Sequence, residues 1–138
     1  CVGFGAASNV SKNLMVNENK RINSFSATFR GRVMLGCPGV VVNGSLDDRF
    51  NGNLNFSFPG IDGDKLMLKL RDLAISSGSA CASATIGPSY VLRALGKSKE
   101  EIKSSIRFGF GRFSTEEDVL IGADKVVQAI KSFGGIKV

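Results

Sequence analysis

The sequence predicts an α/β domain, an α+β sandwich in which helices cover one small sheet. Two segments, 53–58 and 105–111, alternate polar and apolar residues, as half-buried strands do. Segments with apolar residues at helical spacing lie before, between and after them. The chain has 138 residues, enough to enclose one hydrophobic core. Strands and helices that intermix in this way pack as layers around that core.

In the first half of the chain, residues 5–34 are expected to form a helix. A break is expected at 17–19, because asparagine favours turns over helix interiors. Residues 40–42 predict a short strand that ends at the turn pair Asn43 and Gly44. The strand at 53–58 should place its apolar residues on one face. The residues expected to be buried in the helix and the strand are Val10, Leu14, Ile22, Phe25, Phe29, Leu54, Phe56 and Phe58.

In the second half, a helix is expected over 63–74, capped by Asp62 and burying Leu66, Leu68, Leu70 and Leu73, with a short strand at 74–76. Gly87 and Pro88 should open the next helix, and Gly96 should close it. Two Ser/Glu pairs have the spacing of capping boxes, Ser98 with Glu101 and Ser114 with Glu117. Between them lies the strand that alternates Ile106, Phe108 and Phe110. A last helix is expected over 115–133, with Val119, Ala123, Val126, Val127 and Ile130 inward.

The cysteine and histidine content restricts the chemistry. Three cysteines at wide spacing form neither a disulfide framework nor a metal site, and a reducing compartment suits free thiols. The chain contains no histidine, so no Cys–His catalytic pair or histidine metal site can be built, and no metal is expected. Cys37, which precedes Pro38, is expected to be structural.

The charge and hydropathy exclude other classes of protein. The net charge of +6 comes from scattered basic residues and predicts a solvated surface. No apolar run approaches the roughly 20 residues of a membrane span, so no membrane contact is expected. The strand "RFGFGRF" at 107–113 suggests RNA recognition, but Gly109 and Gly111 are displaced from that motif's positions. Specific nucleic-acid binding is therefore not expected.

One cysteine and one arginine are the candidates for chemistry. Cys81 stands in "SSGSACAS" at 76–83, a run of small residues with little apolar surface to bury. Taken alone, it is either an accessible reactive thiol or a small side chain under a loop, and the nearest following cation is Arg93. Arg107 lies on the strand face opposite the aromatic residues. It is either an anion-binding group or an ordinary surface arginine, and Arg112 is expected to be structural.

Three stretches carry a resemblance to a known family. "SSGSAC", "PSYVLRALG" and "SIRFGFGRF", at these spacings, resemble the C-terminal small domain of cysteine desulfurases. These are pyridoxal-phosphate (PLP) enzymes of the class V aminotransferase type with fold-type I, and the match is to the branch with a long catalytic loop. The similarity runs without a gap from about Val40 to the last helix. It implies a connecting helical segment at 1–35 and a small domain at 36–138 with the catalytic loop at 76–87.

The resemblance implies a role for each candidate residue. Cys81 matches the nucleophile that removes sulfur from L-cysteine, giving alanine and a persulfide. Arg107 matches the arginine that binds the substrate carboxylate, and Gly78 and Ser79 are weaker candidates as loop hinges. The sequence departs from the pattern at Gly87, where an acidic residue is usual, which leaves loop docking and acceptor contacts open.

The resemblance also implies what lies elsewhere. The Schiff-base lysine, the ring-stacking histidine and the acidic partner of the ring nitrogen belong to a PLP-binding large domain, so this chain is not expected to bind the cofactor or to be active alone. The implied partners are a sulfur-acceptor protein such as an iron–sulfur scaffold and a second copy in a homodimer. The implied location is the bacterial cytoplasm or an organellar matrix. A stand-alone sulfur-relay or protein-interaction domain without PLP is the alternative.

Overall fold

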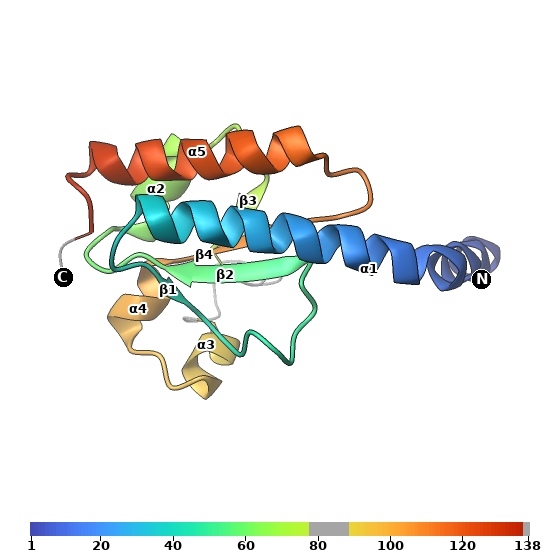
Figure 1. Cartoon of the computed structure of the whole chain (residues 1–138). Coiled ribbons are helices and arrows are strands. Elements are labelled where there is room, and N and C mark those ends of the chain that lie inside the picture. The colour runs from blue at the N-terminus through green and yellow to red at the C-terminus, as the bar shows by residue number, and fades with distance from the viewer. Residues whose placement is uncertain (78–88, 137–138) are drawn as a thin grey trace.

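The computed structural model describes residues 1–77 and 89–136, and it contains a four-stranded antiparallel sheet flanked by helices (Figure 1). The strand order is β1-β2-β4-β3. The strands are β1 (Val41–Val42), β2 (Asn53–Ser57), β3 (Ile75–Ser76) and β4 (Ser105–Gly109). The helices are α1 (Val2–Gly36), α2 (Gly63–Lys69), α3 (Tyr90–Ala94), α4 (Lys99–Lys103) and α5 (Glu116–Ser132). The predicted class and order of elements are confirmed.

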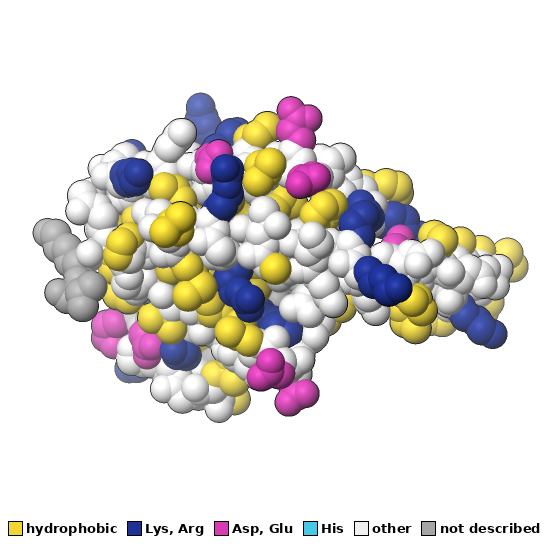
Figure 2. Space-filling model, viewed as in Figure 1, with side chains coloured by type: hydrophobic (Ala, Val, Ile, Leu, Met, Phe, Trp, Pro, Cys, Tyr) yellow, Lys and Arg dark blue, Asp and Glu magenta, His cyan; other side chains and the backbone are white. Residues whose placement is uncertain are grey.

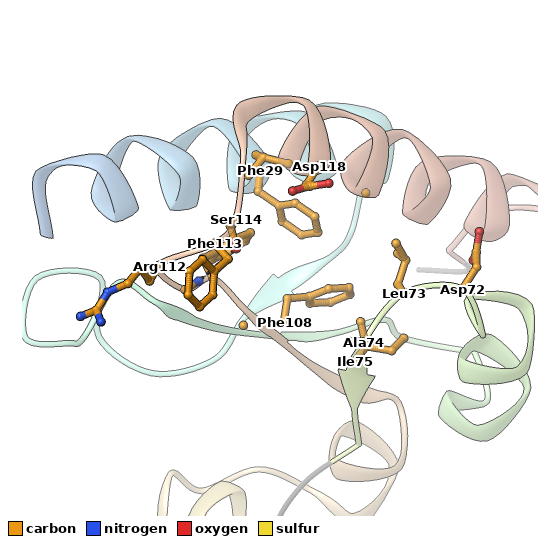
Figure 3. A pocket seen from close by; sticks show the side chains of 15 residues that line it. Phe29, Asp72, Leu73, Ala74, Ile75, Phe108, Arg112, Phe113, Ser114 and Asp118 are labelled. Carbon is orange, nitrogen blue, oxygen red and sulfur yellow. Dashed lines mark hydrogen bonds between the residues drawn. The ribbon is translucent and has the colours of Figure 1, made fainter. Parts of the chain in front are cut away.

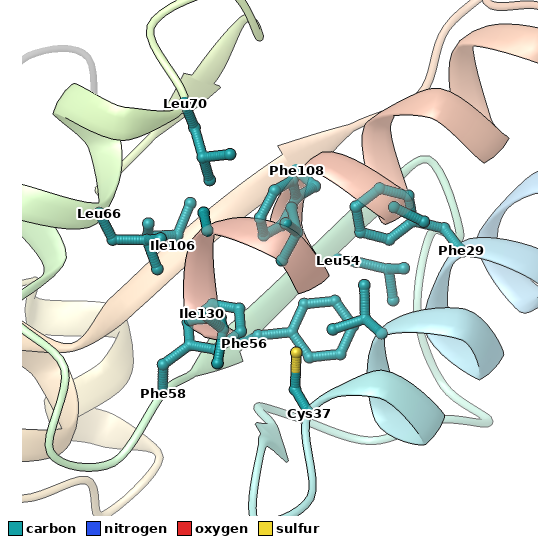
Figure 4. Packing of buried hydrophobic residues seen from close by; sticks show 14 of the residues in the cluster. Phe29, Cys37, Leu54, Phe56, Phe58, Leu66, Leu70, Ile106, Phe108 and Ile130 are labelled. Atoms are coloured by element: carbon teal, nitrogen blue, oxygen red, sulfur yellow. The ribbon is translucent and has the colours of Figure 1, made fainter. Parts of the chain in front are cut away.

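The core lies between the sheet and the helices α1 and α5, which run side by side along one of its faces (Figure 1). Phe56 and Ile106, which are cross-strand partners, are completely buried there. Phe29 of α1 packs on β4, with its ring centroid 5.0 Å from that of Phe108 (Figure 4). Val126 of α5 is also fully buried. The alternating strand pattern and the helical spacing therefore identified the two surfaces that meet.

The first helix differs from its expectation in two ways. It is continuous through 17–19, because side chains on its next turn are held by the body of the protein: Arg21 donates to the carbonyl oxygens of Ser114 (2.7 Å) and Arg112 (2.5 Å). Val10 and Leu14 are 40% and 41% exposed, so their predicted burial is wrong. The reason is that the N-terminal part of α1 extends beyond the sheet, and Figure 2 shows hydrophobic side chains on its surface (Figures 1 and 2).

The helix predicted over 63–74 is shorter than expected. It ends at Lys69, and Leu68 is 73% exposed although its burial was predicted. The chain turns there so that Ile75 can pair with Phe108 at the edge of the sheet. Because that pairing needs an extended backbone, the turn between α2 and β3 takes up residues that the pattern assigned to the helix.

The helix caps are partly as expected. Ser98 and Glu101 form the predicted capping box, and Gly96 follows α3 with a positive φ of 74°. The second predicted box is wrong by one residue, because Thr115 and Asp118 make it in place of Ser114 and Glu117. Ser89 caps α3, and the predicted opening at Gly87 and Pro88 lies outside the described residues. In residues 1–77 and 89–136, no helix is long and apolar enough to cross a membrane.

Candidate active site

The face of the sheet turned away from α1 and α5 is polar. We call it the polar face, and it is formed by Asn43, Asn55, Ser57, Ser76, Ser105 and Arg107. These residues alternate with the core residues along each strand, because successive side chains point to opposite sides of a sheet. The sequence expectation for Arg107, on the face opposite Ile106 and Phe108, agrees with this register.

Arg107 lies near the middle of the polar face, between the neighbouring strands. Asn55 of β2 is its cross-strand partner on one side, and Ser76 of β3 is its partner on the other. The Arg107 side chain is half-buried, and within residues 1–77 and 89–136 it makes no hydrogen bond or ion pair. A guanidinium in this situation keeps its planar set of donors for a ligand such as a carboxylate.

Ser76 is also the point where the chain leaves the sheet toward the predicted catalytic loop. Two residues further along the sequence begins the segment 78–88, so Gly78, Ser79 and Cys81 lie outside the described residues. The structure therefore brings the start of this loop and Arg107 together in one register pair, Ser76 with Arg107.

A buried hydrogen-bond network fills the rest of the polar face. The Asn43 amide nitrogen donates to Asn55 Oδ1 at 2.7 Å and to Ser57 Oγ at 2.8 Å. The hydroxyls of Ser57 and Ser105 are 2.8 Å apart, and Ser105 Oγ donates to the carbonyl oxygen of Glu101 at 2.6 Å. Asn43, Ser57 and Ser105 are each at most 4% exposed. Sequence reasoning missed this network because it assigned Asn43 to a turn, although the polar positions of the alternating strands were a signal for it.

A separate hollow of about 470 Å³ lies on the other side of the sheet. Figure 3 shows the aromatic rings of Phe29, Phe108 and Phe113 around it, with Asp72 and Asp118 at its rim. Its lining does not include Arg107. This hollow is an opening at the edge of the hydrophobic core and does not belong to the polar face.

Cys37 and Arg112 are structural, as predicted. The Cys37 side chain is 1% exposed among the core residues of Figure 4, and burial raises the pKa of its thiol. Arg112 forms an ion pair with Glu18 through two hydrogen bonds, and the bond from its Nη2 to Glu18 Oε2 is 3.0 Å long. Neither side chain reaches the polar face through a hydrogen bond in the described part of the chain.

The described residues do not suit a site for PLP. A Schiff-base lysine needs an enclosed position, whereas the lysines of residues 1–77 and 89–136 are exposed or half-buried. The half-buried ones are already paired with carboxylates, Lys97 with Glu101 and Lys125 with Asp72. The polar face contributes a cation and amide donors, but no group that could form the covalent link.

The helices and the small antiparallel sheet are those of an α/β domain, and comparison with known proteins identifies its family. Residues 1–121 match the aminotransferase class-V family, and the chain belongs to it. It is 51% identical over 130 residues to the cysteine desulfurase IscS of Ectopseudomonas mendocina, covering 94% of this chain and 32% of the relative. It is 45% identical to a cysteine desulfurase of Pongo abelii, covering 94% of this chain and 28% of that protein.

A solved structure shows the same fold. The NifS-like protein from Rickettsia africae superposes with a TM-score of 0.75 at 22% identity, over 96% of this chain and 33% of the other. The chain thus spans about a third of the length of the relatives that it matches.

Proposed function

We propose that the chain is part of a cysteine desulfurase in which Cys81 takes the sulfur atom of L-cysteine. The Cys81 sulfur forms a bond to the substrate sulfur, and the substrate's C–S bond breaks. The bonding electrons stay on the substrate carbon, which takes up a proton to become the methyl group of alanine. The thiol and cysteine are thereby converted to a persulfide and alanine, and no external oxidant or reductant is required.

The pairing of Ser76 with Arg107 is the observation that supports this proposal most directly. It puts the residue that precedes the loop beside a cation with no partner among the described residues. Cys81 is five positions after Ser76 in the sequence, and such a stretch spans at most about 18 Å when fully extended. Chain connectivity therefore keeps the thiol within reach of a substrate whose carboxylate is bound at Arg107.

Each residue has a distinct role in the proposal. Arg107 binds the substrate carboxylate through two parallel hydrogen bonds, which a planar guanidinium can make and an ammonium group cannot. Cys81 is the nucleophile and sulfur carrier. Gly78 and Ser79, small residues between the sheet and the thiol, let the loop change its path when the sulfur is delivered to an acceptor.

The remaining functions belong to the rest of the enzyme. PLP, which stabilises negative charge on the substrate carbon when it is bound, is held outside the described residues, since these offer no enclosed lysine. An iron–sulfur scaffold as acceptor, a homodimer and a bacterial cytoplasm or organellar matrix as location are part of the same proposal. The stand-alone sulfur relay is not favoured, because the similar proteins are named cysteine desulfurases.

The test uses the full-length enzyme loaded with PLP and supplied with L-cysteine carrying a ³⁵S label. The wild type should form alanine and hold label on the peptide that contains Cys81. The Cys81→Ala variant should lose both. The matched control is Cys1→Ser, which removes an exposed thiol at the start of α1 and should leave labelling intact. Label retained by Cys81→Ala would contradict the assignment of the sulfur carrier.

A further inference from the structure

Asn55 stands next to Arg107 at a position where cross-strand side chains approach most closely. Phe58 N donates to Ser104 O at 3.1 Å, which makes these two residues a hydrogen-bonded pair of the β2–β4 ladder. Hydrogen-bonded and non-hydrogen-bonded pairs alternate along antiparallel strands. Asn55 and Arg107, three positions away, are therefore a non-hydrogen-bonded pair, in which opposed Cα atoms are about 4.5 Å apart.

The buried network fixes which end of the Asn55 amide faces Arg107. The direction of the hydrogen bonds in this network is set by the carbonyl oxygen of Glu101. A carbonyl oxygen can only accept, so Ser105 Oγ must be the donor in the bond between them. Ser105 then accepts from Ser57 at 2.8 Å, the shorter of the two contacts open to the Ser57 proton, since Asn43 Oδ1 is 3.2 Å away. Ser57 in turn accepts from the amide nitrogen of Asn43. No member of this chain can be reversed without leaving two donors or two acceptors face to face.

The last link of this chain orients Asn55 itself. The Asn43 amide nitrogen also donates to Asn55 Oδ1 at 2.7 Å, so the oxygen of Asn55 faces β1. Because β2 lies between β1 and β4, an Asn55 oxygen that faces β1 leaves Nδ2 of the same amide for the side of β4, where Arg107 is the cross-strand partner. In residues 1–77 and 89–136 this nitrogen donates no hydrogen bond. The two neighbouring side chains therefore present only donors to each other, an arrangement that suits an anion between them.

From this geometry we infer that Asn55 is a second donor to the substrate carboxylate, beside the guanidinium of Arg107. The inference rests on the proposed function, since that function supplies the carboxylate. A carboxylate has about four acceptor positions, of which the Arg107 fork occupies two, so two remain and one of these can accept the Asn55 N–H. Asn55 then selects for ligands with a carboxylate, and the buried network of Asn43, Ser57 and Ser105 holds it in place.

The experiment compares two ligands by isothermal titration calorimetry with the full-length enzyme loaded with PLP. L-Alanine carries the carboxylate, and L-alaninamide replaces it with a neutral amide. Asn55→Ala should weaken the binding of L-alanine about tenfold, the loss expected for a hydrogen bond to a charged group, and leave that of L-alaninamide unchanged. The matched control is Asn53→Ala, an exposed residue on the same face of β2 that lies opposite Gly109.

Unchanged L-alanine affinity in Asn55→Ala, or equal weakening of both ligands, would overturn the inference. If that variant does not fold, Asn55→Asp decides, because it keeps an oxygen for Asn43 and replaces only the donor. It should lose L-alanine binding more severely, through repulsion between carboxylates. An Asn55→Asp enzyme that binds L-alanine with the affinity of the wild type would overturn the inference. Failure of the proposed function is a different result, in which the wild type itself forms no alanine from L-cysteine.

Discussion

Glu18 and Arg112 join the long first helix to the loop between β4 and α5 through an ion pair with two hydrogen bonds. Arg21, one turn further along α1, donates to two carbonyl oxygens of the same loop. These contacts lie near the place where α1 leaves the body of the protein (Figure 1). They tie the end of the strand that carries Arg107 to a helix far from it in sequence.

The first prediction concerns the pH dependence of this ion pair. The hydrogen bond from Arg112 lowers the pKa of Glu18 below its ordinary value of 4.5. A carboxyl group whose pKa is lower in the folded state stabilises the fold above its unfolded pKa, and the stabilisation is lost as the pH falls through the folded value. Glu18→Gln should therefore reduce the free energy of unfolding at pH 7, and the difference from the wild type should shrink on acidification below about 4.5.

Urea unfolding of both proteins at a series of pH values measures this difference. The control is Asp48→Asn, which removes an exposed carboxylate from the loop after β1. Its difference from the wild type should be small at every pH. A Glu18→Gln effect that persisted unchanged in acid would show that the carboxylate charge does not contribute.

The second prediction is that Arg107→Lys impairs ligand binding and not folding. Lysine keeps the positive charge but lacks the planar fork that engages both carboxylate oxygens. The affinity of the full-length enzyme for L-cysteine should fall about tenfold or more, as expected for one lost charge-assisted hydrogen bond. The thermal unfolding midpoint should stay close to that of the wild type, because the Arg107 side chain makes no hydrogen bond or ion pair with the described residues, and the substitution leaves its backbone pairing intact. Equal affinity in the variant would remove Arg107 from the site.

Much of the fold could be predicted from the sequence, because it depends on local periodicity. The buried residues Leu54, Phe56, Ile106 and Phe108 follow from alternation alone. The continuity of α1 through 17–19 could not be predicted, since it depends on partners about 90 residues away in the sequence, such as the contact of Arg21 with Ser114. Tertiary contacts of this kind override the weak helix propensity of asparagine.

The candidate site also contains one residue that could be predicted from the sequence and one that could not. Arg107 was predicted from a strand pattern and a family resemblance, both of which are properties of the sequence. Asn55 was not found, because its significance depends on its register with Arg107 and on the orientation that Asn43 imposes. Register between strands whose first residues, Asn53 and Ser105, are far apart in the chain is not a local property, so no pattern in either strand could reveal it.

The third prediction follows from the one-residue error at the start of α5. Thr115 Oγ1 accepts a hydrogen bond from Asp118 N at 3.1 Å, and Asp118 accepts one from Thr115 N at 2.9 Å. Thr115→Ala should lower the free energy of unfolding by about 1 kcal/mol, the usual cost of losing an N-cap. Glu117→Ala, at the position that the sequence suggested, should change it little. Urea unfolding of the two variants measures both values, and the reverse order would restore the original assignment.

The last prediction concerns Gly63, the first residue of α2, which packs against the chain between α4 and β4. A Cβ atom at this position would clash with the backbone carbonyl oxygen of Lys103 and would lie 3.7 Å from the Cα of Ser104. Ser104 is next to Ser105, so the backbone cannot move aside without disturbing the buried network of the polar face. Gly63→Ala should therefore destabilise the fold by about 1–3 kcal/mol, the usual cost of overpacking.

Gly31→Ala is the matched control, because this exposed glycine in α1 has open space where a Cβ would be added. It should raise the free energy of unfolding by about 0.5–1 kcal/mol, since alanine favours a helix interior over glycine. Urea unfolding distinguishes the two substitutions by the sign of the change. If both variants were stabilised, α2 could move away from the Lys103 carbonyl at little cost. The close packing of α2 would then not hold the start of β4, and the polar face would have to derive its rigidity from the Asn43 network alone.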